Sequence, residues 1–360
     1  MKLGCAELIH ALTQPTSMAS LSPTQWDLLL RQARAAGLLA RLAALAQQEK
    51  NIDQLPKQAW HILEGDLTFA QQQATAARYE LRLLDRTLKK LDTPVLLLKG
   101  GAYVALNHAA SAGRFMTDID ILITKAHLQD AESALTAAGW MTHSKDAYDE
   151  RYYRAWMHEL PPMRHMSRHT LLDVHHNLLP ETARIRTHPE QVLASAHRLP
   201  GYQCLYVPDH LDLILHSATH LVYEGEWGHG LRDLSDLYLL FAPHVHEAGF
   251  WQRLLARAHE LNLQDPLHYV LVQLQTLFGL SVPVAVARPS PGRGVPYLMT
   301  PVIRLGVLSF HASCRTWLTP VAEFVLYVRS HWLRMPPHLL IPHLLYKAWK
   351  RRVSEKKSQD

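Results

Sequence analysis

Two aspartates, Asp118 and Asp120, have the residue type and spacing that most directly suggest chemistry. They begin residues 118–123, where acids alternate with apolar residues before the run becomes wholly apolar, a pattern that predicts a strand. On a strand both carboxylates would point to the same face and repel each other. A divalent cation relieves such repulsion, and Mg²⁺ prefers oxygen ligands. The alternative is an exposed strand end with two solvated acids.

A glycine turn precedes this pair. Lys99, Gly100 and Gly101 follow residues 94–98, a short apolar run that suits a buried strand, and a helix is expected over residues 102–110. Glycines let a backbone approach a ligand, and free N–H groups at a helix start favour phosphate. An ordinary turn is the alternative. Arg114 could contact a phosphate or lie at the surface.

A third acid, Asp173, lies within residues 171–175, a further predicted strand. An acid between Leu172 and Val174 needs a partner, because an apolar strand solvates a charge poorly. It could hold a metal ion or accept the proton of an attacking hydroxyl. The alternative is an aspartate at a strand end, bonded to backbone.

Several histidines and charged residues have two interpretations. His216 and His220 lie four residues apart on a predicted helix, 211–223, and share one face. The glutamate of a zincin helix is absent between them, so a zinc site is disfavoured. His175 is expected on the same side as Asp173 and could orient it or the substrate. Three further charged residues could form caps and salt bridges, which we favour, or a wall of a substrate pocket: Arg232, Asp233 and Asp236.

The elements that must position these residues suggest an α+β fold, with a small mixed sheet flanked by helical regions. One long helix is expected from about residue 57 to 91. The predicted units are a helical region 1–92, an α/β core 93–180, a helical domain 181–280, a Pro-, Gly- and Ser-rich linker 281–296, and a basic, apolar helical tail 297–360.

Composition narrows the class of protein. Of 360 residues, 48% are hydrophobic and 19% charged, which indicates a globular rather than a disordered chain. Three widely spaced cysteines disfavour a disulfide framework or a cysteine zinc site and favour a reducing compartment. No export signal and no long apolar run is found, and no P-loop or Rossmann glycine pattern occurs. We therefore expect a cytoplasmic protein.

The basic charge is concentrated in the tail. Residues 326–357 contain eight Lys or Arg and one acid, a net +7 against +5 for the whole chain, so the remainder is slightly acidic. The core therefore gives no strong sign of nucleic-acid binding. Aromatic and aliphatic residues alternate with the basic ones. Such a segment could contact the inner face of an anionic membrane, dock on a partner, or fold back on its own core.

The order of these motifs resembles the uncharacterised bacterial nucleotidyltransferase family within the polymerase-β superfamily. Three strings carry the resemblance: Leu-Lys-Gly-Gly at 98–101, Arg-x-x-x-Asp-Ile-Asp-Ile-Leu at 114–122, and Leu-Asp-Val-His at 172–175. It is strongest over residues 95–176. The sheet would then be a nucleotidyltransferase core, and the helix that carries His216 and His220 would pack beside its cleft. We expect these two residues and His175 to line that cleft.

The resemblance also implies a reaction and its residues. A nucleoside monophosphate would move from an NTP to an acceptor hydroxyl on a protein, a sugar or a small molecule, releasing pyrophosphate. Two Mg²⁺ ions, or Mn²⁺ in their place, would assist. The metal-binding and catalytic residues would be Asp118, Asp120 and Asp173, and the nucleotide-binding residues Lys99, Gly100, Gly101 and Arg114.

One position departs from the superfamily pattern. Many members have serine, whose hydroxyl contacts phosphate, where this chain has Gly101. The substitution leaves only backbone contacts there. The alternative function is therefore a catalytically weak or inactive module that keeps the fold for binding or regulation.

Overall fold

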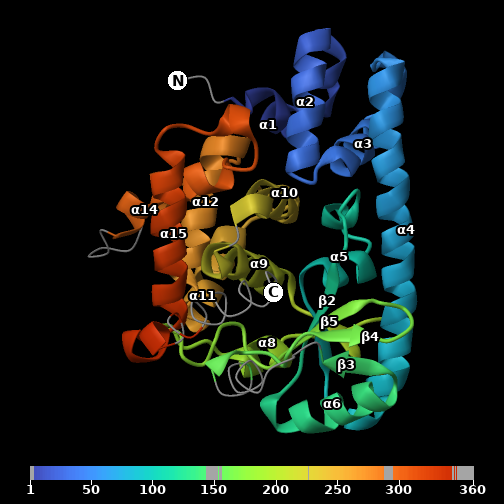
Figure 1. The fold of residues 1–360 in the computed structure, drawn as a ribbon, viewed down its shortest axis with the longest axis vertical. Helices are drawn as coiled ribbons and strands as arrows, with labels where there is room; N and C mark the ends of the chain where they lie inside the picture. Colours follow the sequence, from blue (N-terminus) through green and yellow to red (C-terminus); the bar gives the residue numbers. More distant parts are fainter. Residues whose placement is uncertain are drawn as a thin grey trace, which may run out of the picture.

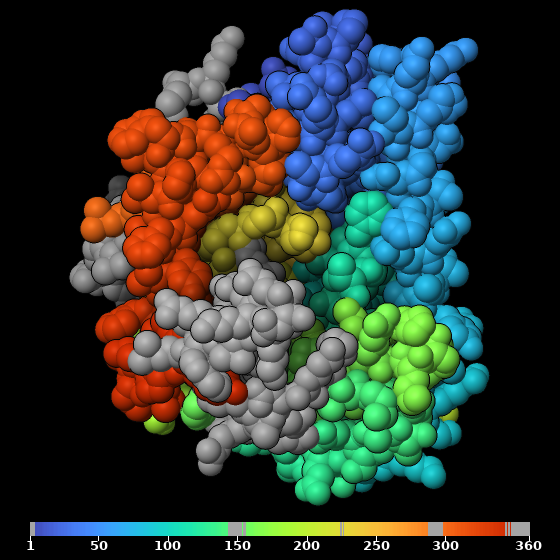
Figure 2. Space-filling view, in the orientation of Figure 1, coloured from blue at the N-terminus to red at the C-terminus, as the bar shows by residue number. Residues whose placement is uncertain are grey.

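The structure, a computed structural model, describes residues 4–142, 153, 156–225, 227–287, 295–342, 344 and 346. Within them a mixed sheet lies between the long helix α4 on one flank and the C-terminal helices on the other (Figure 1). This arrangement confirms the predicted α+β class with helical flanks. The same two flanks, blue and orange, border the face shown in Figure 2.

The sheet has seven strands in the order β3-β4-β5-β2-β1-β7-β6. Central strand β2 runs antiparallel to β1 and parallel to β5, and the register pairs Asp120 with Asp173. The strands are β1 (Val95–Leu97), β2 (Asp118–Leu122), β3 (Trp140–Thr142), β4 (Met163–His165), β5 (Leu171–His175), β6 (His197–Arg198) and β7 (Leu205–Val207). The three predicted strands are confirmed. The others are two or three residues long, and β6 and β7 lie in the segment predicted as helical.

The N-terminal helices form one flank of the sheet. Ser22 caps α2 with a capping box: its hydroxyl accepts from the Gln25 N–H at 3.4 Å, and the Gln25 side chain accepts from the Ser22 N–H at 3.0 Å. The 32-residue α4 confirms the predicted long helix and packs against α3, α5 and α6. The helices are α1 (Ala6–Thr13), α2 (Pro23–Ala35), α3 (Leu39–Gln48) and α4 (Lys57–Leu88).

Shorter helices connect the strands. Helix α5 (Lys99–Ala105) begins three residues earlier than the predicted helix 102–110 and is followed by a 3-10 turn, Ala109–Ser111. Helix α6 (Leu128–Ala137) ends before Gly139, whose φ of 94° requires the freedom of glycine. Helix α8 (Pro189–Ala194) precedes β6.

The C-terminal helices form the other flank. Helix α12 packs against α9, α14 and also α1, so the first and last parts of the fold meet. These helices are α9 (His210–Glu224), α10 (Gly230–Phe241), α11 (Phe250–Glu260), α12 (Gln264–Phe278), α13 (Val284–Ala287), α14 (Val295–Val307) and α15 (Thr319–Arg334). Part of the predicted linker is helix α13, and residues 288–294 lie outside the described residues, as do residues 347–357 of the basic tail. No helix among the described residues is long and apolar enough to cross a membrane.

A buried carboxylate joins the flanks to the sheet. Asp236 of α10 accepts hydrogen bonds from Arg41 of α3 and from Arg114, which precedes β2, each at 2.7 Å. Arg41 also donates to the Ala110 carbonyl at 2.6 Å. Burial lowers the pKa of Arg41. Burial also acts to lower the pKa of Arg114, but the charges of Asp236 and Asp233 together outweigh it and raise that pKa. One buried acid thus serves two guanidinium groups, and Asp233 adds further negative charge near Arg114.

We expect Asp236→Asn to lower the free energy of unfolding by about 3–5 kcal/mol, because it leaves two buried guanidinium groups without a counter-charge. Denaturant unfolding measures the loss. Arg41→Met/Asp236→Asn should recover part of it, since one cation is gone. The control Asp27→Asn breaks an exposed pair with Arg31 and should cost less than about 1 kcal/mol. Equal losses in Asp236→Asn and the control would contradict this role.

Candidate active site

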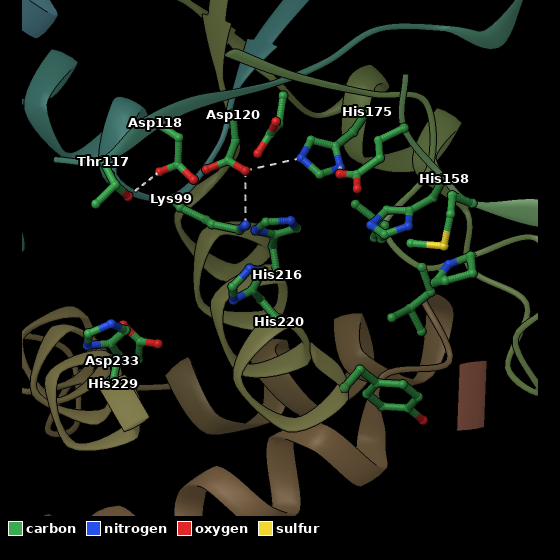
Figure 3. A pocket seen from close by; sticks show the side chains of 18 of the residues that line it. Lys99, Thr117, Asp118, Asp120, His158, His175, His216, His220, His229 and Asp233 are labelled. Carbon is green, nitrogen blue, oxygen red and sulfur yellow. Dashed lines mark hydrogen bonds and ion pairs between the residues drawn. The ribbon is translucent and has the colours of Figure 1, made fainter. Parts of the chain in front are cut away.

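Three carboxylates meet at the centre of the sheet. Asp118 and Asp120 of β2 and Asp173 of β5 each place one oxygen within 4.8 Å of the others. The cause is the strand geometry: residues 118 and 120 share a face, and the parallel register places Asp173 opposite Asp120. Asp118 also accepts a hydrogen bond from the Thr117 hydroxyl at 2.8 Å (Figure 3).

Asp120 is buried but compensated. Its Oδ1 contacts Lys99 Nζ at 3.0 Å and His175 Nε2 at 3.1 Å (Figure 3). Burial alone would raise the pKa of Asp120, but the charges of Lys99 and His175 outweigh it and hold the pKa well below its usual range. Asp120 is therefore an ionised carboxylate, fixed in direction by two donors.

Asp173 is not compensated in this way. Burial, then the negative charges of Asp120 and Glu159, raise the pKa of Asp173 to about 7. The raised pKa of Asp173 indicates that too little positive charge lies near the three carboxylates. A hard divalent cation such as Mg²⁺ suits both the oxygen-only ligand set and this missing charge.

Lys99 has an unusual backbone. Its φ of 45° lies in the left-handed region, which residues other than glycine, asparagine and aspartate rarely adopt. The position begins α5, directly after β1, and aims the ammonium group at Asp120. Local strain of this kind persists where the surrounding structure imposes it and is common at functional sites. The family resemblance implied a nucleotide-binding role for Lys99, and the structure shows its ion pair with Asp120.

The two glycines of the turn lie in different surroundings. Gly100 lines the cavity, and a Cβ there would be 2.8 Å from both Arg114 Nη1 and Met116 Sδ. Gly101 is buried outside the cavity lining, and its Cβ would be 3.7 Å from Ile119 Cγ2. A serine at position 101 would thus start beside Ile119, on the strand face opposite the acids. The structure brings Gly100, and not Gly101, to the cavity.

A polar cavity of about 520 Å³ opens in front of the carboxylates, within the usual size range of small-ligand pockets. His175 lines it from β5, and His216 and His220 line it from α9, facing the carboxylates (Figure 3). Burial, and then the charge of Lys99, hold the pKa of His216 well below its usual range, so its ring is neutral. Among the described residues, neither α9 histidine belongs to a group that could hold a metal ion.

Charged side chains of α10 and the approach to β2 complete the wall. Arg114 lines the cavity while bonded to Asp236, and its guanidinium lies 5.9 Å from the Tyr103 ring centre. Arg232 and Asp233 also line the cavity and form an ion pair at 2.9 Å. Both roles suggested by the sequence, salt bridge and pocket wall, thus apply to these two residues, whereas Asp236 is structural.

Several lining residues were not foreseen. His158 and Glu159 lie on a short segment beside β5, and Glu159 Oε2 is 3.3 Å from His175 Nδ1. Burial lowers the pKa of His175, but Asp120 and Glu159 outweigh it and raise the pKa above its usual value. Thr117 and Arg334 also line the cavity. No periodicity marks residues 158–160, so the sequence offered no signal for them.

The mixed sheet carries two aspartates on β2 and a third acid on β5, its parallel neighbour. The lysine-glycine turn precedes these strands in the sequence. This is the organisation of a nucleotidyltransferase. Comparison with protein families agrees. The model of a family described as uncharacterised nucleotidyltransferase matches residues 22–279, and the chain belongs to this family. No curated protein and no solved structure matches the chain.

The glycine pair gives a matched test. Gly100→Ala should weaken binding of a non-hydrolysable NTP analogue by about tenfold, because the new methyl group displaces Met116 and Arg114, and Arg114 lines the cavity. Gly101→Ala should bind within about twofold of the unchanged protein, since its methyl group makes an ordinary contact with Ile119. Calorimetric titration measures both. Equal weakening by the two variants would show that Gly100 has no special place at the site.

Proposed function

We propose that this protein transfers a nucleoside monophosphate from an NTP to an acceptor hydroxyl and releases pyrophosphate. The observation that carries the proposal is the group of Asp118, Asp120 and Asp173, with ligand oxygens within 4.8 Å on the wall of a cavity of about 520 Å³. Membership of a nucleotidyltransferase family supports this reaction class and an NTP substrate. A bond forms from the acceptor oxygen to the α-phosphorus, and the bond to the pyrophosphate oxygen breaks.

The three carboxylates are the residues that would hold one or two Mg²⁺ ions, and Mn²⁺ suits the same oxygen ligands. Bound there, such ions would neutralise charge on the triphosphate and help to orient it. Asp118 and Asp120 belong to one strand and Asp173 to the next, so the sheet itself fixes their spacing.

Other residues of the chain position the reacting groups. Lys99 and His175 keep Asp120 ionised and oriented. Gly100 lines the cavity with Arg114 packed against its backbone, and the Arg114 guanidinium supplies positive charge at the cavity wall. The hydroxyl proton passes to a carboxylate of the group or to solvent.

The far wall of the cavity is where an acceptor would lie. His216, His220, Arg232 and Asp233 give this wall both hydrogen-bond donors and acceptors. It therefore suits a polar acceptor, such as a sugar, a small molecule or a protein side chain that carries a hydroxyl.

Substitution of the paired acids tests the proposal. Asp118→Asn/Asp120→Asn should abolish Mg²⁺-dependent binding of an NTP analogue and lower NTP consumption by at least about 100-fold, because the metal ligands are gone. Asp130→Asn, on the exposed face of α6, is the matched control and should change neither. Unchanged NTP consumption in the double variant would refute the assignment. Metal-dependent binding without turnover in the unchanged protein would instead support the alternative, a binding or regulatory module.

We also propose that α15 contacts an anionic membrane surface. Val321, Phe324, Val328 and Trp332 recur at helical spacing on one face of this helix, and each is between 46% and 67% exposed. The basic residues 347–357 follow in the sequence and supply charge complementary to anionic lipid. The combination suits a peripheral contact.

Phe324→Ser/Val328→Ser should reduce co-sedimentation with vesicles that contain phosphatidylserine, since it removes apolar area from the exposed face. Phe69→Ser, which alters an exposed aromatic residue on α4, is the control and should bind as the unchanged protein does. Deletion of residues 326–360 should release the protein into the soluble fraction. Equal sedimentation of all variants, or binding to neutral vesicles alone, would refute the membrane contact.

A further inference from the structure

A second group of metal-binding side chains lies beside the three aspartates. His158, Glu159 and His175 each place one ligand atom within 4.8 Å of the others, and all three line the cavity. Unlike the aspartates, this group offers two imidazole nitrogens and one carboxylate. Mixed nitrogen and oxygen ligands select a different class of ion from an oxygen-only set.

The backbone holds these residues in place. Residues 158–160 run antiparallel to the end of β5, with an isolated bridge between Glu159 and His175. Two hydrogen bonds fix the register: Leu160 N–H donates to the Val174 carbonyl at 2.9 Å, and His176 N–H to the His158 carbonyl at 2.8 Å. The side chains therefore extend from paired backbone, which limits their movement.

The tautomer of His175 follows from its neighbours. Nε2 lies 3.1 Å from Oδ1 of Asp120, an ionised carboxylate that can only accept, so Nε2 carries a proton. Nδ1 lies 3.3 Å from Glu159 Oε2. In a neutral ring, Nδ1 would present a lone pair to that carboxylate, and two acceptors would face each other. A cation held by Nδ1 and the Glu159 carboxylate would convert this contact between two acceptors into a favourable one.

We propose that His158, Glu159 and His175 bind a transition-metal ion of the zinc class, at a site distinct from that of the aspartates. Zinc accepts imidazole nitrogen and carboxylate oxygen together, whereas Mg²⁺ prefers oxygen. Asp120 fits the arrangement, because metal-bound histidines commonly donate their other N–H to a carboxylate. His175 then links the two sites, with one nitrogen directed to each.

The ligand count suggests what this site does. Three protein ligands leave a fourth zinc position open, as in catalytic rather than structural sites. The three side chains line the cavity, so the open position is available to a molecule within it. We assign it to an oxygen or nitrogen donor of the acceptor. This last assignment rests on the proposed function, whereas metal binding by the three residues does not.

Cobalt binding to the full-length protein tests the site. The metal-free protein is saturated with Mg²⁺, to fill the aspartate site, and titrated with Co²⁺, with binding followed by visible absorption. We expect one Co²⁺ per chain, displaced by Zn²⁺ and not by further Mg²⁺. His158→Gln and Glu159→Gln should each weaken Co²⁺ binding by at least about tenfold, as loss of one of three ligands requires. Circular dichroism checks that each variant folds.

Two controls separate this site from other binding. The chain has 24 histidines, so His61→Gln, on the surface of α4, tests for scattered binding and should change nothing. Asp118→Asn/Asp173→Asn should leave Co²⁺ binding intact even though NTP turnover is lost, so failure of the proposed function and failure of this inference are distinguishable. No Co²⁺ binding by the unchanged protein would overturn the proposal and leave a proton between His175 and Glu159. Co²⁺ binding by His158→Gln and Glu159→Gln as tight as that of the unchanged protein would also overturn it.

Discussion

The buried carboxylate of Asp236 is the interaction on which the rest of the structure depends. This carboxylate of a C-terminal helix accepts hydrogen bonds from Arg41 in the N-terminal helices and from Arg114 in the segment before β2. A charge that is removed from water must be met by opposite charge in a fixed geometry, so the three parts of the fold cannot shift independently. One of the two guanidinium groups, that of Arg114, also lines the cavity wall, so this interaction positions a residue of the site.

The carboxylates of the cavity also differ in how their charge is compensated. Lys99 and His175 supply positive charge to Asp120 from within the protein. Asp173 is instead buried beside the negative charges of Asp120 and Glu159. The protein itself thus keeps Asp120 ionised and oriented, whereas a further positive charge, such as a bound metal ion, would favour ionisation of Asp173. The strained backbone of Lys99 belongs to the same arrangement, because it directs the ammonium group to Asp120. The strained φ of Lys99 costs conformational energy, and the ion pair with Asp120 that it allows helps to offset that cost.

The sequence predicted the parts of the fold that rest on long or repeated patterns: α4, and the strands that carry the three acids. Strands of two or three residues, such as β6 and β7, contain too little alternation to be recognised. They depend on pairing, β7 with the edge of β1 and β6 with β7. The order of the three acids in the sequence predicted that they would lie close together in the fold. It could not predict that Lys99 pairs with Asp120, or that Glu159 faces His175, because these contacts depend on register and backbone direction. For the same reason the sequence could not predict that Gly101 faces Ile119.

The parallel pairing of β2 with β5 has a consequence for how the chain folds. Parallel neighbours cannot be joined by a tight hairpin, and here α6, β3 and β4 lie between them in the sequence. Closing that loop carries an entropic cost before any contact repays it, and closure brings Asp173 against the like charges of β2. We therefore expect the docking of β5 to be a slow step of folding, and cations that screen or bind the carboxylates to accelerate it.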